Sequence, residues 1–214
     1  MNRGIATLRC AFLAALLLLA LSGTARAWNR EAAKDYAQEY ALSHNPNFAY
    51  ISGADCANFV SQSIWDGGIA MDNDWYYDFA YDLCSYYWST APAFHNYFKD
   101  SPRTYLYRYL VGTYDFDDST SRPRPPRNVS QMLRGDIVSY DWDLNGGSDW
   151  TIDHVAIVTG LNAHSTYDYD WQGNLRCQHS TDRYREAWQC GDRYSSTYMQ
   201  DWGFAAWGLL NSLD

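Results

Sequence analysis

The chain has 214 residues, of which 16 are basic and 25 are acidic, so its formal charge at neutral pH is −9. This excess of negative charge argues against nucleic acid as a partner, because nucleic-acid binding depends on a basic surface. Aromatic residues make up 17% of the chain, a content typical of a globular protein and not of a disordered one.

The first 27 residues have the pattern of a secretory signal peptide. Arg3 and Arg9 precede the apolar run "AFLAALLLLAL", and "ARA" ends at Ala27 as a cleavage site. The run is shorter than the roughly 20 residues that span a bilayer, so we expect no membrane anchor. Cleavage before Trp28 removes three basic residues and no acidic ones, which leaves a formal charge of −12. The sequence therefore predicts a secreted or periplasmic protein.

Two helices are predicted in the first third of the chain. In residues 29–44, "NREAAKDYAQEYALSH", alanines and tyrosines recur at helical spacing, and Asn29 can cap the first turn. A second helix is expected from the apolar spacing that begins at Cys56 and stops at Gly67. Asp55 is the expected N-cap of this helix, which places Cys56 in its first turn.

Residues 71–128 are rich in aromatic and acidic side chains and lack a clear period until Thr90, after which a helix through Phe98 is predicted. We interpret the aromatic residues as packing groups, with a glycan-stacking groove as the alternative. The segment "SRPRPPR", residues 121–127, is a connector within one domain that we expect to span residues 28–214.

The sequence predicts strands in the second half of the chain. "GDIVSYDW", residues 135–142, and "HVAIVTG", residues 154–160, are β-branched runs of strand length, and "NLRCQHST", residues 174–181, is a weaker third run. Short connections between them favour an antiparallel sheet. Because helices precede strands, the expected fold class is α+β.

Cys56 is a candidate nucleophile. A thiol reacts as the thiolate, and the partial positive charge at a helix N-terminus lowers its pKa. His154, at the start of a strand, is the candidate base, and a further polar residue is expected to hold its other ring nitrogen. We assign that role to His179, with Asp182 as the reserve candidate.

The cysteine count leaves a second interpretation open. Without the leader the chain has four cysteines, and an even number in an exported protein suggests two disulfides, one of which would include Cys56. If Cys56 is catalytic, Cys177 and Cys190 are close enough in sequence to form a disulfide, and Cys84 is then a small buried apolar group.

Five ordered segments carry a resemblance to a known family. "AAKDYAQEYALSHNPNFAYI", "DCANFVSQSIWDGG", "GDIVSYDWD", "DHVAIVTG" and "QHSTDR" together resemble the putative amidase domain family of secreted bacterial proteins, a branch similar to the NlpC-type papain-like cysteine hydrolases. The resemblance implies a papain-like fold in which a helix-borne cysteine and a strand-borne histidine act together. Carried over to this chain, the residues are Cys56, His154 and His179, with the backbone N–H of Cys56 as an oxyanion donor.

The loop of residues 141–153 resembles the opening of a calcium-binding loop. In "DWDLNGGSD", Asp141, Asp143 and Asn145 stand at alternate positions before a glycine, although the twelfth position is Ile152 in place of an acidic residue. An acidic hairpin without an ion is the alternative. A bound calcium ion would be structural, and we expect that catalysis requires no cofactor.

The sequence thus predicts a monomeric, exported cysteine hydrolase that cleaves amide bonds in peptidoglycan stem peptides or another cell-envelope peptide. Two alternatives stay open. One is a non-catalytic envelope or glycan-binding module with Cys56 in a disulfide. The other is an acyltransferase, because the same thioester intermediate can react with an amine in place of water.

Overall fold

The computed structural model describes residues 27–100, 106–114, 125–142, 149–189 and 202–209. The predicted signal peptide lies outside these residues except for its last position, and so does most of the predicted Pro/Arg connector. Within the described residues, no helix is both long enough and apolar enough to cross a bilayer.

The first predicted helix is α2 (Arg30–Tyr40). The side chain of Asn29 caps it by accepting a hydrogen bond from the backbone N–H of Ala32 at 3.1 Å. Its alanine-rich stripe is buried as the spacing predicted.

The second predicted helix is α3 (Cys56–Asp66), which begins at Cys56 and has Gly67 as its C-cap. Every side chain from Cys56 to Ile64 is buried, so α3 is the central helix of the molecule. A Cβ atom at Gly67 would lie 2.3 Å from the ring of Trp28, which explains the glycine at this helix end.

The region after α3 forms a small hairpin and two helices. The hairpin consists of β1 (Tyr77–Asp78) and β2 (Leu83–Cys84), and it is followed by α4 (Tyr86–Ser89) and α5 (Ala91–Asp100). Helix α5 confirms the helix predicted after Thr90. Trp75 and Trp88 are fully buried, which fits the packing role assigned to part of the aromatic region.

Within the part of the chain that the structure describes, the main sheet has six strands in the order β3-β8-β4-β5-β6-β7, and each neighbouring pair is antiparallel. The three strands predicted from sequence are β4 (Ile137–Asp141), β5 (His154–His164) and β6 (Gln172–Gln178). The others are β3 (Leu106–Tyr114), β7 (Arg183–Ala187) and β8 (Trp202–Leu209). Helices packed on an antiparallel sheet confirm the α+β class.

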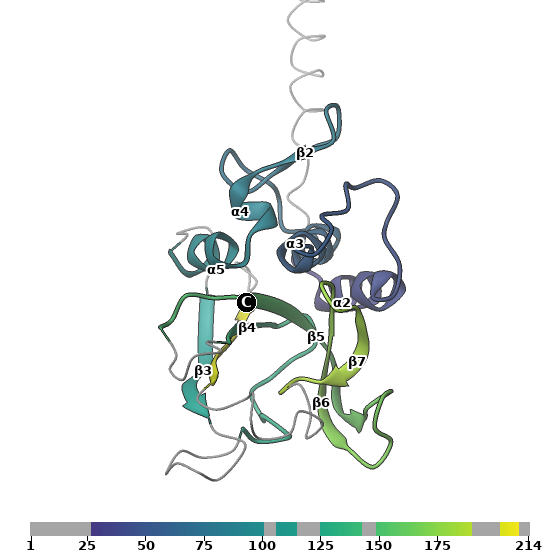
Figure 1. Cartoon of the computed structure of the whole chain (residues 1–214), viewed down its shortest axis with the longest axis vertical. Helices are drawn as coiled ribbons and strands as arrows, with labels where there is room; N and C mark the ends of the chain where they lie inside the picture. Colours follow the sequence, from purple (N-terminus) through teal and green to yellow (C-terminus); the bar gives the residue numbers. More distant parts are fainter. Residues whose placement is uncertain (1–26, 101–105, 115–124, 143–148, 190–201, 210–214) are drawn as a thin grey trace, which may run out of the picture.

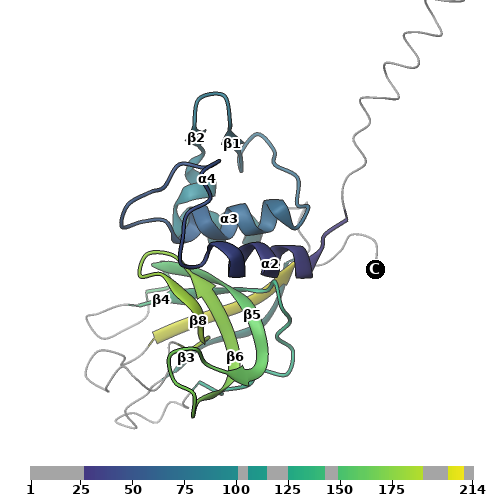
Figure 2. The same cartoon turned by 90° about the vertical axis from the view of Figure 1, so that its right-hand side faces the viewer.

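The helices form one layer and the six-stranded sheet the other (Figure 1). Figure 2 shows α2 and α3 side by side across the sheet, with the β1-β2 hairpin on the far side of the helices. Side chains alternate along β5: Val155 and Ile157 join the core shared with α2 and α3, whereas Ala156 and Val158 join a second core on the opposite face.

Candidate active site

Cys56 and His154 line the same cavity, which has a volume of about 450 Å³. It lies where α3 begins, beside the α4–α5 junction and the residues that lead into β5. The remaining lining residues are Gly53, Ala54, Ser89, Thr90, Ala91, Pro92, Trp142, Thr151, Ile152, Asp153 and Ser180. The structure therefore brings together the predicted nucleophile and the predicted base.

Cys56 is a free thiol and the first residue of α3. Its side chain is largely covered, with 6% exposure, and burial raises the pKa of the thiol. The backbone N–H groups of Val155, Ala57 and Cys56 itself act in the opposite direction and lower this pKa. The helix start thus provides donors for a thiolate, but burial keeps the resting sulfur protonated.

His154 is 2% exposed, and its ring stacks on Trp142 with 4.5 Å between ring centroids. Burial, followed by the charge of Arg176, lowers the pKa of His154 to about 3, and the hydrogen bond with Gln178 opposes this change. His154 is therefore an uncharged imidazole at neutral pH.

Gln178, and not the predicted His179, is the polar side chain in contact with the His154 ring. The Oε1 atom of Gln178 lies 2.8 Å from Nε2 of His154. The carboxamide is oriented because its Nε2 donates to the backbone oxygen of Thr181 at 2.9 Å. With Oε1 turned to the ring, Nε2 of His154 is the donor, and its Nδ1 is left as the basic nitrogen.

His179 lies on the opposite side of β6 from Gln178 and faces the helices. Its Nδ1 is 2.5 Å from the carboxylate of Asp55, and its Nε2 is 2.8 Å from the backbone oxygen of Tyr40. Burial lowers the pKa of His179, but the Asp55 and Tyr40 hydrogen bonds outweigh it and the net effect is a raised pKa. With both ring nitrogens engaged there, His179 does not orient His154.

Asp55 stands at the N-cap position of α3 without capping the helix by its side chain. Its carboxylate instead accepts hydrogen bonds from the backbone N–H of Ile51 and the side chain of Asn58, in addition to His179. Its own N–H donates to Ser180 Oγ at 2.7 Å, which joins the helix start to the turn after β6. The predicted cap is therefore the bridge between α3 and the sheet.

Asp182, the reserve candidate, is half-buried and acts on His179 through its charge. Together with His44 and His179 it offers ligand atoms that lie within 4.8 Å of one another, and this is the group of the described residues that could hold a metal. A metal there would have to displace a hydrogen bond of His179, so the geometry favours the Asp55 pairing.

The disulfide prediction is wrong for Cys177, which is a free thiol. Its sulfur is completely buried, 3.4 Å from the Thr159 hydroxyl, and accepts the backbone N–H of Arg185. Its predicted partner, Cys190, lies outside the described residues. Since Cys84 and Cys56 are also free, the alternative that placed Cys56 in a disulfide is not supported.

The calcium prediction falls largely outside the described residues, because Asp143 and Asn145 lie in residues 143–148. Asp141 is buried, and its Oδ2 accepts the backbone N–H of Trp150 at 2.6 Å, which closes the loop before β5. Calcium binding by this loop stays a prediction.

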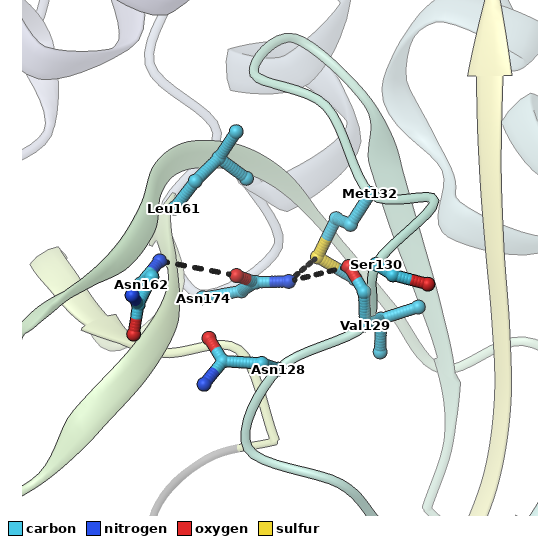
Figure 3. Close-up of a pocket in the computed structure, with 7 residues that line it drawn as sticks. All are labelled: Asn128, Val129, Ser130, Met132, Leu161, Asn162 and Asn174. Atoms are coloured by element: carbon cyan, nitrogen blue, oxygen red, sulfur yellow. Dashed lines mark hydrogen bonds between the residues drawn. The ribbon is translucent and has the colours of Figure 1, made fainter.

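A second cavity, of about 340 Å³, lies on the face of the sheet away from the helices (Figure 3). Amide and apolar side chains line it, and the Asn174 side chain is held by Val129, Met132 and Asn162. Ser130 contributes a hydroxyl to this cavity, but none of the lining residues could act as a general base for it. This cavity lacks the groups needed for acyl transfer.

Gln178 and Arg176 are the site residues that the sequence analysis missed. Both stand in the predicted strand "NLRCQHST", where alternation puts Gln178 and His179 on opposite faces. An apolar Cys177 facing the helices would have placed His179 on that same face. The alternation of side chains along this strand is therefore the signal that favours Gln178 as the partner of His154.

A free thiol at a helix start and an oriented imidazole on one cavity form the kind of site that performs nucleophilic attack on acyl groups. The chain belongs to the putative amidase domain family, whose sequence profile matches residues 27–201. It is also similar to the uncharacterized protein YjcM of Bacillus subtilis (strain 168), with 31% identity over 133 residues, which cover 60% of this chain and 27% of that relative. No solved structure matches the chain.

Proposed function

We propose that this protein is an exported, papain-like cysteine hydrolase that cleaves amide bonds in peptidoglycan stem peptides or another cell-envelope peptide. The observation that carries the proposal is the cavity shared by Cys56 and His154, with Gln178 holding the far nitrogen of the imidazole. A carboxamide in the third position is the arrangement of Cys-His-Asn proteases. Membership of an amidase family supports the bond type.

The first half of the reaction forms a thioester. Nδ1 of His154 takes the proton of the Cys56 thiol as the sulfur attacks the amide carbonyl carbon. The negative oxygen of the tetrahedral intermediate is held by the backbone N–H of Cys56, one of the first-turn groups without an acceptor inside the helix. The imidazolium then protonates the leaving amine, and the carbon–nitrogen bond breaks.

The second half of the reaction releases the acid. His154 takes a proton from a water molecule, which attacks the thioester carbonyl. The second tetrahedral intermediate collapses, the carbon–sulfur bond breaks, and the proton returns from His154 to the Cys56 sulfur. Gln178 keeps the ring in one orientation through both halves.

The cavity wall favours an uncharged or positively charged part of a peptide. Among the described lining residues, Asp153 is the one with a formal charge, and hydroxyls of Ser89, Thr90 and Ser180 supply neutral hydrogen-bonding groups. Export through the predicted signal peptide would deliver such an enzyme to envelope peptides.

The test is digestion of purified peptidoglycan with the wild-type protein and the Cys56→Ala variant, followed by mass spectrometry of the products. We expect new amine and carboxylate ends with the wild type and a loss of about 10⁴-fold or more in the variant. The matched control is Cys84→Ala, which removes a half-buried thiol outside the cavity. Hydrolysis that continues unchanged in Cys56→Ala would contradict the proposal. Amine acceptors added to the digest distinguish hydrolysis from acyl transfer.

Exposed aromatic side chains favour a second activity, contact with glycan. Several large side chains in and next to the hairpin and α4 are exposed, namely Tyr76, Phe79, Tyr81, Tyr86 and Tyr87. Aromatic rings of this kind can stack on sugars, and α4 leads directly into the cavity wall at Ser89. Retention of Cys56→Ala on insoluble peptidoglycan, lost when Tyr81 and Tyr86 are changed to serine, would support this role, whereas equal retention of both proteins would exclude it.

A further inference from the structure

The turn between β6 and β7 brings a hydroxyl group to the start of α3. Ser180 lines the same cavity as Cys56 and His154, and its Oγ accepts the backbone N–H of Asp55 at 2.7 Å. Asp55 directly precedes Cys56, whose own N–H holds the oxyanion in the proposed reaction. The hydroxyl of Ser180 is therefore bound to the amide next to that donor.

The backbone of Asp55 turns these two amides to the same side of the chain. Its φ is −86° and its ψ is 0°. At this ψ the nitrogen atoms of two successive residues are eclipsed, so the N–H groups of Asp55 and Cys56 lie next to each other, as in the backbone turns that bind anions. An oxygen atom that accepts from the Cys56 N–H would consequently lie beside the Oγ atom of Ser180.

The proton of the Ser180 hydroxyl is available to a ligand. Because Oγ accepts from Asp55, its hydrogen can point to another acceptor, and among the described residues Ser180 Oγ donates to no protein group. The other hydroxyls of the cavity wall differ. Those of Ser89 and Thr90 donate to backbone oxygens one turn earlier in the chain, and Thr151 is exposed in the loop before β5. Ser180 thus combines a free donor with contact to the helix start.

The turn that carries Ser180 has a costly backbone conformation. The φ angle is 60° at Ser180 and 78° at Thr181, in the left-handed region where hairpin turns usually place Asn or Gly. This region is unfavourable for a β-branched residue. Neighbouring contacts hold the turn, since Gln178 Nε2 donates to the Thr181 carbonyl and His179 is bound to Asp55. Strained backbone of this kind is concentrated at functional sites, and here it keeps the Ser180 hydroxyl against α3.

We propose that Ser180 is a catalytic residue, the side-chain donor that completes the oxyanion hole together with the backbone N–H of Cys56. The inference deepens the proposed function and rests on it. As the Cys56 sulfur bonds to the carbonyl carbon, the π electrons of the carbonyl move to its oxygen. The Ser180 hydroxyl donates a hydrogen bond to that oxygen and keeps its own proton. When the intermediate collapses, the carbonyl forms again and the leaving amine takes its proton from His154.

The test compares two reactions of the same thiol, each followed by mass spectrometry of the Cys56 peptide. Acylation by p-nitrophenyl acetate passes through a tetrahedral oxyanion, whereas alkylation by iodoacetamide does not. In Ser180→Ala, we expect acylation to be slower by about 10²-fold or more, as for the loss of other oxyanion donors, and alkylation to be unchanged. The matched control is Ser165→Ala, which removes a buried hydroxyl that also accepts a backbone N–H but lies outside the cavity. It should leave both rates unchanged.

Equal acylation of wild type and Ser180→Ala overturns the proposal. A parallel fall of acylation and alkylation also overturns it, because Ser180 would then only hold the helix start in place. If Ser180→Ala does not fold, Ser180→Gly removes the same hydroxyl and suits the positive φ, and the same results decide.

Neither reagent is a peptide, so the Ser180 proposal can fail while the peptidoglycan digestion succeeds. Slower acylation of the variant without any digestion by the wild type would support the donor and contradict the substrate. A wild type that p-nitrophenyl acetate does not acylate at Cys56 would contradict both the nucleophile and the donor.

Discussion

Two buried histidines, 25 residues apart in the chain, lie in polar clusters with opposite electrostatics. His154 and His179 are each 2% exposed. Carboxamide oxygen and guanidinium surround the first, whereas a carboxylate and a backbone oxygen surround the second. The pKa of His154 is lowered to about 3, mainly by burial, while that of His179 is raised by Asp55 and Tyr40 despite its burial.

Neither the residue type nor the depth of burial distinguishes the two rings. The partners differ: a neutral carboxamide oxygen accepts from the His154 ring, whereas the Asp55 carboxylate favours the protonated form of the His179 ring, which joins elements of the fold.

The largest effect is expected for His154→Ala. Loss of the general base should reduce amide turnover by about 10⁴-fold, because the thiol no longer has a proton acceptor. The free energy of unfolding, measured with urea, should change much less than turnover does. The comparison between the two histidines fails if His179→Ala lowers turnover of the folded protein by as much.

The next effect is the loss of stability in His179→Ala. Removing His179 leaves the buried Asp55 carboxylate without its partner at Oδ2, so the free energy of unfolding should fall by about 3–5 kcal/mol. Chemical denaturation followed by tryptophan fluorescence measures it. His44→Ala, at the exposed neighbouring ring, is the control and should cost far less.

A smaller effect is expected for Gln178→Ala, which should lower turnover about 10²-fold by freeing the imidazole to rotate. Gln178→Asn shortens the side chain but keeps the carboxamide, and it should recover part of the loss. Steady-state kinetics on one peptide substrate measure both. Equal activity of Gln178→Ala and wild type would show that Gln178 does not orient the imidazole of His154.

The smallest effect is a pair of opposite pH slopes in stability. Unfolded His154 takes up a proton near pH 6.5 and the folded form only near pH 3, so its contribution is lost as the pH falls through this range. The raised pKa of His179 means that its contribution is complete below about pH 6.5 and is lost as the pH rises through the folded-state value.

These slopes are measured by urea unfolding at a series of pH values. His154→Gln should flatten the acid side of the stability profile, and His179→Gln should flatten the other side. His164→Gln, an exposed histidine, controls for the substitution itself. Identical profiles for the His154 and His179 variants would remove the electrostatic distinction between the two clusters.

Local patterns were enough to predict α2, α3, α5 and three strands, and with them the positions of Cys56 and His154. They did not predict β7, whose sequence "RYREA" is polar partly because Arg183 and Glu186 belong to the buried cluster around Arg176. Nor did they predict the pairing of β3 with β8, since contacts between such distant segments leave no local period.

Residue type alone also does not predict which polar residue contacts His154. From the sequence, the third position is assigned to His179, a polar residue on the neighbouring strand that matches the family segment "QHSTDR". Strand alternation and the carboxylate of Asp55 assign His179 to the helix side, and only the folded structure shows that carboxylate in contact with it.

The bridge from Asp55 to β6 has a consequence for how activity appears during folding. Asp55 and His179 are separated by 124 positions, and Asp55 directly precedes the nucleophile. A chain emerging from its N-terminus can form α3 early, yet the start of that helix is fixed only once β6 has docked. The thiol therefore stays inert in the nascent chain, and in a refolding experiment enzymatic activity should lag behind the recovery of helical circular dichroism.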